Sequence, residues 1–331
     1  MRPDERWMKA AAALGERGRG RTAPNPCVGC LIVKDGKLLG RGWTQEGGRP
    51  HAEAMALAEA GEEASGATCY VTLEPCAEPG RGPACADALI HAGIARLVAA
   101  IHDPFPSVDG KGFEKLRAAG IAVEIGPGAA EAERTMAGFL ARQRLGRPYV
   151  TLKLAMSLDG KIAPASGSSR WITGEDARAH AHLERARADM ILVGRGTVDA
   201  DSPALDVRLV GLEDRSPRRA ILTSGEAPQG WEKVATPEAI SELEAVNDLI
   251  VEGGAGAASA FLAADLVDRL LVYRAPILIG EGKSALGDIG LASLAAAHGR
   301  WRLEDSRTLG IDRLEVYVRV RQDSAPAAHP E

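Results

Sequence analysis

The chain has 331 residues, of which 45% are hydrophobic and 26% charged, a composition typical of globular proteins. Its net charge is −5 and its first half is nearly neutral, which argues against the basic surface that binds a polynucleotide. No apolar run approaches the ~20 residues of a membrane helix, and the N-terminus lacks the apolar core of a signal peptide. We therefore expect a cytoplasmic protein of two domains that acts on a small molecule, with neither a nucleic acid nor a membrane as partner.

Helical and strand patterns alternate in the first half of the chain. The spacing of apolar residues predicts helices over 7–18, 53–64, 85–93, 112–119 and 129–145. Strands are predicted over 28–33, 38–43, 67–73, 95–101 and 121–124, with a hairpin turn at 34–37. This alternation is typical of a three-layer α/β domain.

Gly146-Arg147-Pro148 interrupts the last of these helices, so we place a domain boundary between residues 147 and 148. Strands are then predicted over 149–155, 190–193, 219–223, 248–252, 269–273 and 313–319. A capping box of Thr173 and Asp176 predicts a helix over 175–188, and a polar loop is expected up to about 208. The second domain thus covers 148–321 and is also α/β, while 322–331 has the composition of a disordered tail.

Four residues of the first domain form a pattern that indicates a catalytic zinc site. His51, Cys76 and Cys85 offer one imidazole and two thiolates, which leaves the fourth position of a tetrahedral zinc ion open. Glu53 lies two residues from the histidine and can carry protons between water and substrate without binding the metal. Zinc-dependent nucleobase deaminases share this arrangement, although their cysteines are usually separated by two residues rather than the eight found here. The alternative is a solvated His-x-Glu pair with unrelated buried cysteines.

The other three cysteines are interpreted as core residues. Cys27 and Cys30 have the spacing of a redox or zinc motif, but they flank the start of a predicted buried strand. Cys69 lies within another strand. Five cysteines, two of them assigned to zinc, do not indicate a disulfide framework.

A glycine-rich segment, 254–259, follows the predicted strand 248–252 and precedes an alanine-rich helix. Glycines at such a position let backbone N–H groups approach a phosphate at the helix N-terminus. The segment comes close to the dinucleotide fingerprint but ends in Ser259. Phosphate binding and tight packing of helix on strand both remain open from this pattern alone.

Seven short motifs occur in one order and resemble the bifunctional deaminase–reductase family of riboflavin biosynthesis. They occupy 24–30, 51–53, 72–76, 157–161, 166–173, 196–201 and 251–254, and the resemblance extends over roughly 1–320. It implies an N-terminal cytidine-deaminase-like domain and a C-terminal dihydrofolate-reductase-like domain. The first would use one zinc ion to deaminate 2,5-diamino-6-ribosylamino-4(3H)-pyrimidinone 5′-phosphate. The second would use NADPH to reduce the ribosyl group to a ribityl chain, and a homodimer is expected by analogy.

The resemblance also implies roles for individual residues. Glu53 corresponds to the proton shuttle of the deaminase and Lys153 to the active-site lysine of the reductase. The implied cofactor set is Ala155, Trp171, Thr197, Asp201, Ser224, Gly254, Ala255, Gly256, Ala257, Ala258 and Ser259. The implied substrate set is Asn25 in the deaminase, with Ser169, Arg185, Leu205, Arg208 and Glu252 in the reductase.

The chain departs from the family pattern in two places. Glu78 and Pro79 stand where the family usually has histidines between the two cysteines, and the reductase half is compact between Val207 and Glu252. Two rival functions also remain open: a deaminase of nucleic acids or free nucleosides, and a non-catalytic protein with structural zinc. Ammonia release from pyrimidine nucleotides, measured with and without NADPH, separates the three.

Overall fold

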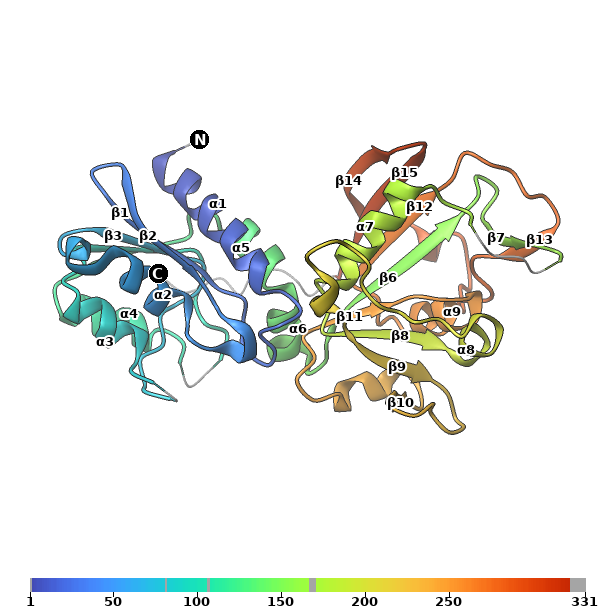
Figure 1. Cartoon of the computed structure of the whole chain (residues 1–331), viewed down its shortest axis with the longest axis horizontal. Helices are drawn as coiled ribbons and strands as arrows, with labels where there is room; N and C mark the ends of the chain where they lie inside the picture. Colours follow the sequence, from blue (N-terminus) through green and yellow to red (C-terminus); the bar gives the residue numbers. More distant parts are fainter. Residues whose placement is uncertain (1, 81, 106–107, 167–170, 322–331) are drawn as a thin grey trace. The chain divides into compact units, whose positions relative to one another are not determined.

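The computed structural model describes residues 2–80, 82–105, 108–166 and 171–321 and divides the chain into two compact units (Figure 1). The first unit consists of Met1–Pro148 with Glu244–Asn247, and the second of Tyr149–Leu243 with Asp248–Glu331. Within the described ranges, no helix has both the length and the apolar character that a membrane crossing requires. The predicted tail 322–331 and the expected substrate residue Ser169 lie outside the described residues.

The first unit is built on a five-stranded sheet with the order β2-β1-β3-β4-β5. β1 and β2 form the predicted hairpin, in which Lys34 pairs with Lys37, while β3, β4 and β5 run parallel. The strands are β1 (Gly29–Lys34), β2 (Lys37–Trp43), β3 (Thr68–Val71), β4 (Arg96–Ala99) and β5 (Ala122–Ile125). Each falls within or beside a range predicted from the sequence, and the predicted three-layer architecture is confirmed.

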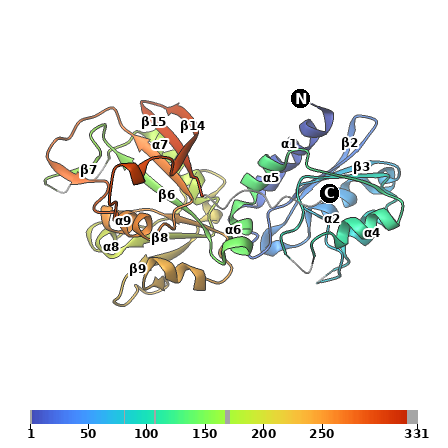
Figure 2. The same ribbon diagram turned by 180° about the vertical axis from the view of Figure 1, so that it is seen from behind.

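Helices cover both faces of this sheet, with α1 and α5 on one face and α2, α3 and α4 on the other (Figures 1 and 2). The helices are α1 (Pro3–Gly15), α2 (Ala52–Ala60), α3 (Cys85–His91), α4 (Lys111–Ala118), α5 (Ala129–Thr135) and α6 (Ala137–Leu145). A Cβ atom on Gly42 would lie 2.2 Å from the carbonyl oxygen of Ala52, and one on Gly40 would lie 2.1 Å from that of Ala56. These glycines therefore let α2 pack directly on β2, which fixes the helix that begins beside His51.

One helix prediction in this unit is wrong. The sequence predicts a single helix over 129–145, but the structure has α5 and α6, separated at Met136 with φ −101° and ψ 18°. Met136 is almost completely buried, so packing of its side chain into the core coincides with the break. No glycine or proline marks this position, and the pattern of apolar residues continues across it.

The second unit contains an eight-stranded sheet with the order β10-β9-β8-β11-β6-β12-β15-β14. The first six strands in this order, from β10 at the edge to β12, run parallel to one another. β15 pairs antiparallel with β12, and β14 pairs antiparallel with β15 at the other edge. The strands are β6 (Tyr149–Met156), β8 (Met190–Gly194), β9 (Arg218–Leu222), β10 (Glu232–Val234), β11 (Asp248–Val251), β12 (Arg269–Arg274), β14 (Trp301–Leu309) and β15 (Asp312–Arg319). β7 (Lys161–Pro164) and β13 (Gly282–Ser284) form a separate pair. β7, β10, β13 and β14 were not predicted.

In the described part of this unit the sheet is accompanied by the α-helices α7 (Glu175–Arg185), α8 (Arg195–Asp201) and α9 (Ala255–Ala263). The predicted capping box of α7 is wrong, because the N-cap is Gly174 and its N–H donates to Asp312 Oδ2 at 2.7 Å. α8 occupies part of the predicted polar loop. The predicted glycine-rich loop is also shorter than expected, because helix α9 already begins at Ala255.

Candidate functional site

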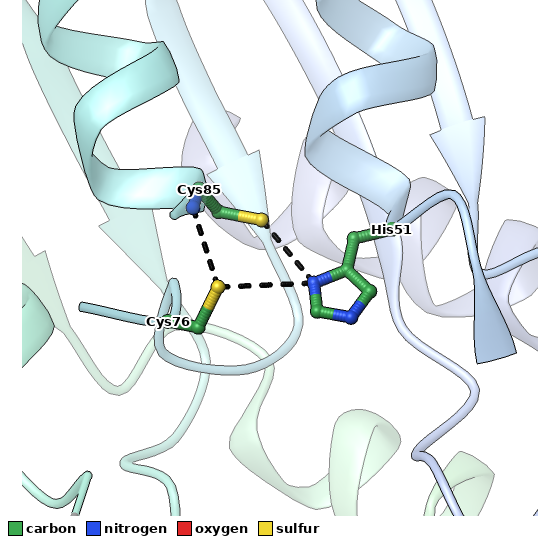
Figure 3. Close-up of side chains that lie close together, drawn as sticks. All are labelled: His51, Cys76 and Cys85. Carbon is green, nitrogen blue, oxygen red and sulfur yellow. Dashed lines mark hydrogen bonds between the residues drawn. The ribbon is translucent and has the colours of Figure 1, made fainter. Parts of the chain in front are cut away.

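The structure brings the three predicted metal ligands together in the first unit. His51 is the N-cap of α2, Cys85 is the first residue of α3, and Cys76 follows β3 in the loop between them. His51 Nδ1 lies 3.3 Å from Cys85 Sγ and 3.8 Å from Cys76 Sγ (Figure 3). The N–H of Cys85 donates to Cys76 Sγ at 3.2 Å, so the start of α3 favours negative charge on this sulfur.

The chemistry of this donor set fits zinc. The three ligand atoms lie within 4.8 Å of one another, and no other His, Cys, Asp or Glu in the described ranges joins the group. The hydrogen bond with Cys85 and the nearby His51 lower the pKa of the Cys76 thiol to about 4, which favours the thiolate that zinc requires. Two sulfurs and one nitrogen are typical of a catalytic zinc site in which one position remains for a small molecule.

Glu53 lies in the first turn of α2, beside the cluster. Its side chain is almost completely buried, and this burial raises the pKa of its carboxyl group. Glu53 also interacts with the Cys85 thiol. A carboxyl group in such a position can accept a proton from a water molecule at the metal and return it to a leaving group.

Asn25 packs against the loop that leads to His51. A Cβ atom on Gly48 would lie 1.7 Å from Asn25 Nδ2, so only glycine allows this approach. Gly48 also has φ +84°, a conformation that L side chains rarely adopt. This close packing fixes the Asn25 amide beside the loop that leads to His51.

A second group of possible metal ligands, Glu74, His102 and Asp109, is better explained as a structural link. Glu74 Oε1 accepts the N–H of Gly112 at 2.9 Å, and Oε2 accepts that of Gly110 at 3.0 Å. Since both oxygens face backbone donors, a cation there would meet the positive ends of these N–H groups. Glu74 therefore fixes the start of α4 relative to the segment that carries Cys76. Sequence reasoning missed this residue, although an acidic side chain next to a buried strand was a usable signal.

The remaining cysteines are core residues, as predicted. Cys27, Cys30 and Cys69 are 5%, 0% and 0% exposed. Cys30 Sγ lies 3.5 Å from Cys69 Sγ, and Cys27 Sγ donates to the carbonyl oxygen of Thr135. None of the three belongs to the metal group.

In the second unit, the half-buried Lys153 and Arg185 form an ionic cluster with the buried Glu252. Arg185 donates two hydrogen bonds to Glu252, from Nε at 2.7 Å and from Nη2 at 2.9 Å, and Lys153 Nζ lies 3.6 Å from Glu252 Oε2. Burial alone would raise the pKa of Glu252, but Lys153 and Arg185 lower it to about 2. Glu252 is therefore ionised, and its ion pair holds the side chain of Lys153, which lies in the middle of β6.

Tyr273 and His180 adjoin this cluster and were missed by sequence reasoning. Lys153 Nζ lies 5.9 Å from the centre of the Tyr273 ring, and Tyr273 Oη lies 2.7 Å from His180 Nδ1. Tyr273 is 1% exposed, and burial raises the pKa of its hydroxyl group. The sequence shows Tyr273 as an aromatic residue within a predicted strand. Ordinary core residues have the same pattern, so the sequence does not mark Tyr273 as functional.

The start of α9 has the properties of an anion site. Gly254 is its N-cap, and the N–H of Gly254 donates to Thr197 Oγ1 at 3.0 Å. A Cβ atom on Gly256 would meet nothing within 4 Å, so space lies open beside the first turn. Ser259 is used differently, because its hydroxyl oxygen accepts the N–H of Gly287 at 2.8 Å. The residues at this helix start fit a cofactor phosphate.

The other expected reductase residues are more scattered. Leu205 is buried with φ +56°, and the N–H of Arg208 donates to His182 Nδ1 at 3.3 Å on α7. No hydrogen bond or ion pair within the described ranges joins the remaining four to the ionic cluster or to the start of α9: Ala155, Trp171, Asp201 and Ser224.

Comparison with protein families matches both units. The cytidine and deoxycytidylate deaminase zinc-binding region matches residues 1–101, and the RibD C-terminal domain matches residues 148–314. The first match contains His51, Cys76 and Cys85, and the second contains the ionic cluster and the start of α9.

Curated and solved proteins resemble the chain over nearly its whole length. Riboflavin biosynthesis protein RibD from Escherichia coli is 42% identical, over 93% of this chain and 97% of its own. The RibD of Aquifex aeolicus is 41% identical, over 88% and 92%. A solved RibD from Acinetobacter baumannii is 38% identical with a TM-score of 0.84, over 96% and 99%. A diaminohydroxyphosphoribosylaminopyrimidine deaminase/5-amino-6-(5-phosphoribosylamino)uracil reductase from Thermotoga maritima is 32% identical with a TM-score of 0.86, over 96% and 99%.

Proposed function

The chain belongs to the RibD family of riboflavin biosynthesis proteins, and we propose that it performs two consecutive reactions on one pyrimidine ribonucleotide. The first is hydrolytic deamination of 2,5-diamino-6-ribosylamino-4(3H)-pyrimidinone 5′-phosphate. The second is NADPH-dependent reduction of the ribosyl group to a ribityl chain. The observation that carries the proposal is the buried Glu53 beside a set of one imidazole and two thiolates. We assign deamination to residues 1–147 and reduction to residues 148–321.

In the deaminase, His51, Cys76 and Cys85 would hold one zinc ion per chain. Zinc bound in such a site supplies a Lewis acid that makes water a better nucleophile. Glu53 takes the proton that the attacking water loses and passes it to the amino group, which leaves as ammonia. The amide of Asn25 orients the pyrimidine ring by hydrogen bonding.

In the reductase, NADPH supplies the hydride, and the protein supplies orientation and charge. The first turn of α9, from Gly254 to Ser259, would receive a cofactor phosphate, with Thr197 holding its backbone. Lys153 would donate a hydrogen bond to the carbonyl oxygen of the open-chain ribose, which makes the carbon a better hydride acceptor. Glu252 holds Lys153 in place through their ion pair.

The remaining assignments follow the family by position. We propose that Ala155, Trp171, Asp201 and Ser224 contact the cofactor. The substrate would be held by Ser169, Arg185, Leu205, Arg208 and Glu252. The guanidinium group of Arg185 is already bonded to Glu252, so any contact of Arg185 with a phosphate uses its remaining N–H groups.

The test is to give the purified chain the diaminopyrimidine nucleotide. Without NADPH, ammonia should be released and the product mass should change by replacement of an amino group with oxygen. With NADPH, cofactor oxidation should follow and two hydrogens should be added. Ammonia release from cytidine or from single-stranded DNA, without any from this nucleotide, would overturn the proposal.

We also propose that the protein is a cytoplasmic homodimer. The second unit exposes large apolar side chains, among them Leu278 at 75%, Leu294 at 75% and Ile311 at 73%, which a second copy could cover. Sedimentation equilibrium would give twice the chain mass, and cell fractionation would recover the protein with the cytoplasm. A monomer at micromolar concentration would contradict the proposed homodimer.

A further inference from the structure

Arg49 occupies an unusual position beside the metal cluster. It lies two residues before His51, in the loop in which Gly48 packs against Asn25. Its half-buried side chain extends to the loop between the two cysteines: a Cβ atom on Gly80 would lie 2.7 Å from Arg49 Nη2, and one on Gly82 would lie 3.6 Å from Nη1. The guanidinium group therefore lies against the backbone of that loop, where glycines leave room for it.

Among the described residues, none forms a salt bridge with Arg49. Its side chain forms neither a hydrogen bond nor an ion pair with any part of the chain that the structure describes. Glu46, three residues before Arg49, pairs with Arg21, and Glu78, in the loop between the two cysteines, lies 3.8 Å from Lys111. A half-buried guanidinium group has lost part of its hydration, and an anion that binds it compensates for that loss.

Arg49 also lies close to the metal cluster in the chain, two residues before His51. Arg49 thus places positive charge between the loop that carries the metal-binding histidine and the loop that joins the two cysteines. A planar guanidinium with five N–H donors matches the geometry of a phosphate.

We propose that Arg49 binds the 5′-phosphate of the nucleotide in the deaminase site and so makes this unit select a nucleotide over the corresponding nucleoside. The inference rests on the proposed function, because it assumes that the deaminase substrate is a nucleotide. It assigns to Arg49 a role in substrate binding, and none in metal binding or in proton transfer.

The test compares two substrates, the diaminopyrimidine nucleotide and the same compound without its phosphate, by ammonia release from the full zinc-loaded chain. For Arg49→Gln we expect the KM of the nucleotide to rise about tenfold to a hundredfold, the scale of a lost charged hydrogen-bond pair. The KM of the nucleoside and the kcat of both should stay unchanged, and so should the zinc content. Arg49→Lys should retain part of the preference for the nucleotide over the nucleoside.

Two further variants sharpen the result. Gly80→Ala should raise the KM of the nucleotide in the same direction, because its new methyl group displaces only the mobile end of Arg49. Arg41→Gln is the matched control, since Arg41 lies on the surface and pairs with Glu59. An equal rise of KM for nucleotide and nucleoside, no rise for either, or loss of zinc from Arg49→Gln would overturn the inference. A wild-type chain that releases no ammonia from the nucleotide would instead contradict the proposed function.

Discussion

Among the five cysteines, the half-buried Cys76 and the buried Cys85 adjoin His51, whereas Cys27, Cys30 and Cys69 lie in the core. We expect about one tightly bound zinc ion per chain, as one imidazole and two thiolates provide. Cys76→Ala and Cys85→Ala should lose both zinc and deamination, while Cys27→Ala and Cys30→Ala should keep the metal. Elemental analysis of the purified variants measures this, and a metal-free chain that still deaminates would contradict it.

We expect Glu53 to transfer protons and not to bind the metal. Glu53→Gln keeps the shape of the side chain but cannot accept a proton. The variant should retain zinc and lose deamination by on the order of a hundredfold or more, the usual scale of general acid–base catalysis. Ammonia release and zinc content are measured on the same sample. Substantial deamination by the zinc-loaded variant would assign the proton transfer to another group.

Glu252 should make the second unit sensitive to acid. Its pKa is lowered from 4.5 to about 2, so the ionised carboxylate stabilises the fold above pH 4.5 and this stabilisation is lost as the pH falls towards 2. The shift corresponds to about 3 kcal/mol in the free energy of unfolding. Glu252→Gln should therefore be less stable than the wild type at neutral pH. Its free energy of unfolding should also fall less than that of the wild type between pH 4.5 and about pH 2.

Urea unfolding of the second unit between pH 7 and pH 2 checks this expectation. The matched control is Glu232→Gln, because Glu232 forms an exposed ion pair with Arg218, which contributes at most about 1 kcal/mol. Parallel stability curves for wild type and Glu252→Gln across the acid range would show that the ionic cluster contributes nothing to folding.

At the scale of single residues, the sequence allowed prediction of the metal group but not of the ionic cluster. His51, Cys76 and Cys85 are recognisable because zinc chemistry restricts both residue type and order. The pair of Arg185 and Glu252 joins residues 67 positions apart, on α7 and after β11, and nothing in the sequence marks which of its many arginines and glutamates come together. Only the fold decides which of them meet.

The helix α9 carries the clearest prediction at the scale of elements. A Cβ atom on Gly256 would meet nothing within 4 Å, and one on Gly254 would lie 3.7 Å from Thr197 Oγ1, an ordinary contact, so valine at either position should leave the fold intact. The added side chain should block a phosphate at the helix start and abolish NADPH oxidation. Ala263→Val, at the exposed far end of the same helix, is the matched control. Thermal unfolding, NADPH binding and NADPH oxidation are measured for all three variants.

If the valine variants at Gly254 and Gly256 bound and oxidised NADPH normally, these glycines would have a packing role only. The cofactor phosphate would then have to bind elsewhere in the second unit. If Ala263→Val lost the activity as well, general damage to α9 would explain the result.

Element boundaries followed from the sequence where one local signal dominated. The hairpin at Lys34–Lys37 was predicted because Asp-Gly favours that turn, and both residues adopt positive φ. The break at Met136 and the cap of α7 were not predictable. The first depends on how a methionine packs into the core, and the second on Asp312, a residue 138 positions from Gly174.

At the scale of the whole molecule, the two chemistries occupy separate units of one chain. The metal cluster lies entirely in the first unit, and the ionic cluster and the start of α9 lie entirely in the second. Each unit has its own sheet and its own buried core, and each family model matches one of them. We therefore expect that neither reaction needs a residue of the other unit for its chemistry.

The two activities should therefore be separable by mutation. Hydride transfer from a nicotinamide requires a phosphate site and a polarised carbonyl group, but no zinc ligand. Glu53→Gln should still oxidise NADPH when it receives the already deaminated nucleotide, and Gly254→Val should still release ammonia. Both variants are assayed with each substrate, and their equimolar mixture should convert the diaminopyrimidine nucleotide to the ribityl product. If Glu53→Gln failed to reduce the deaminated nucleotide despite normal folding and NADPH binding, the units would depend on each other for chemistry, and the proposed division of labour would be wrong.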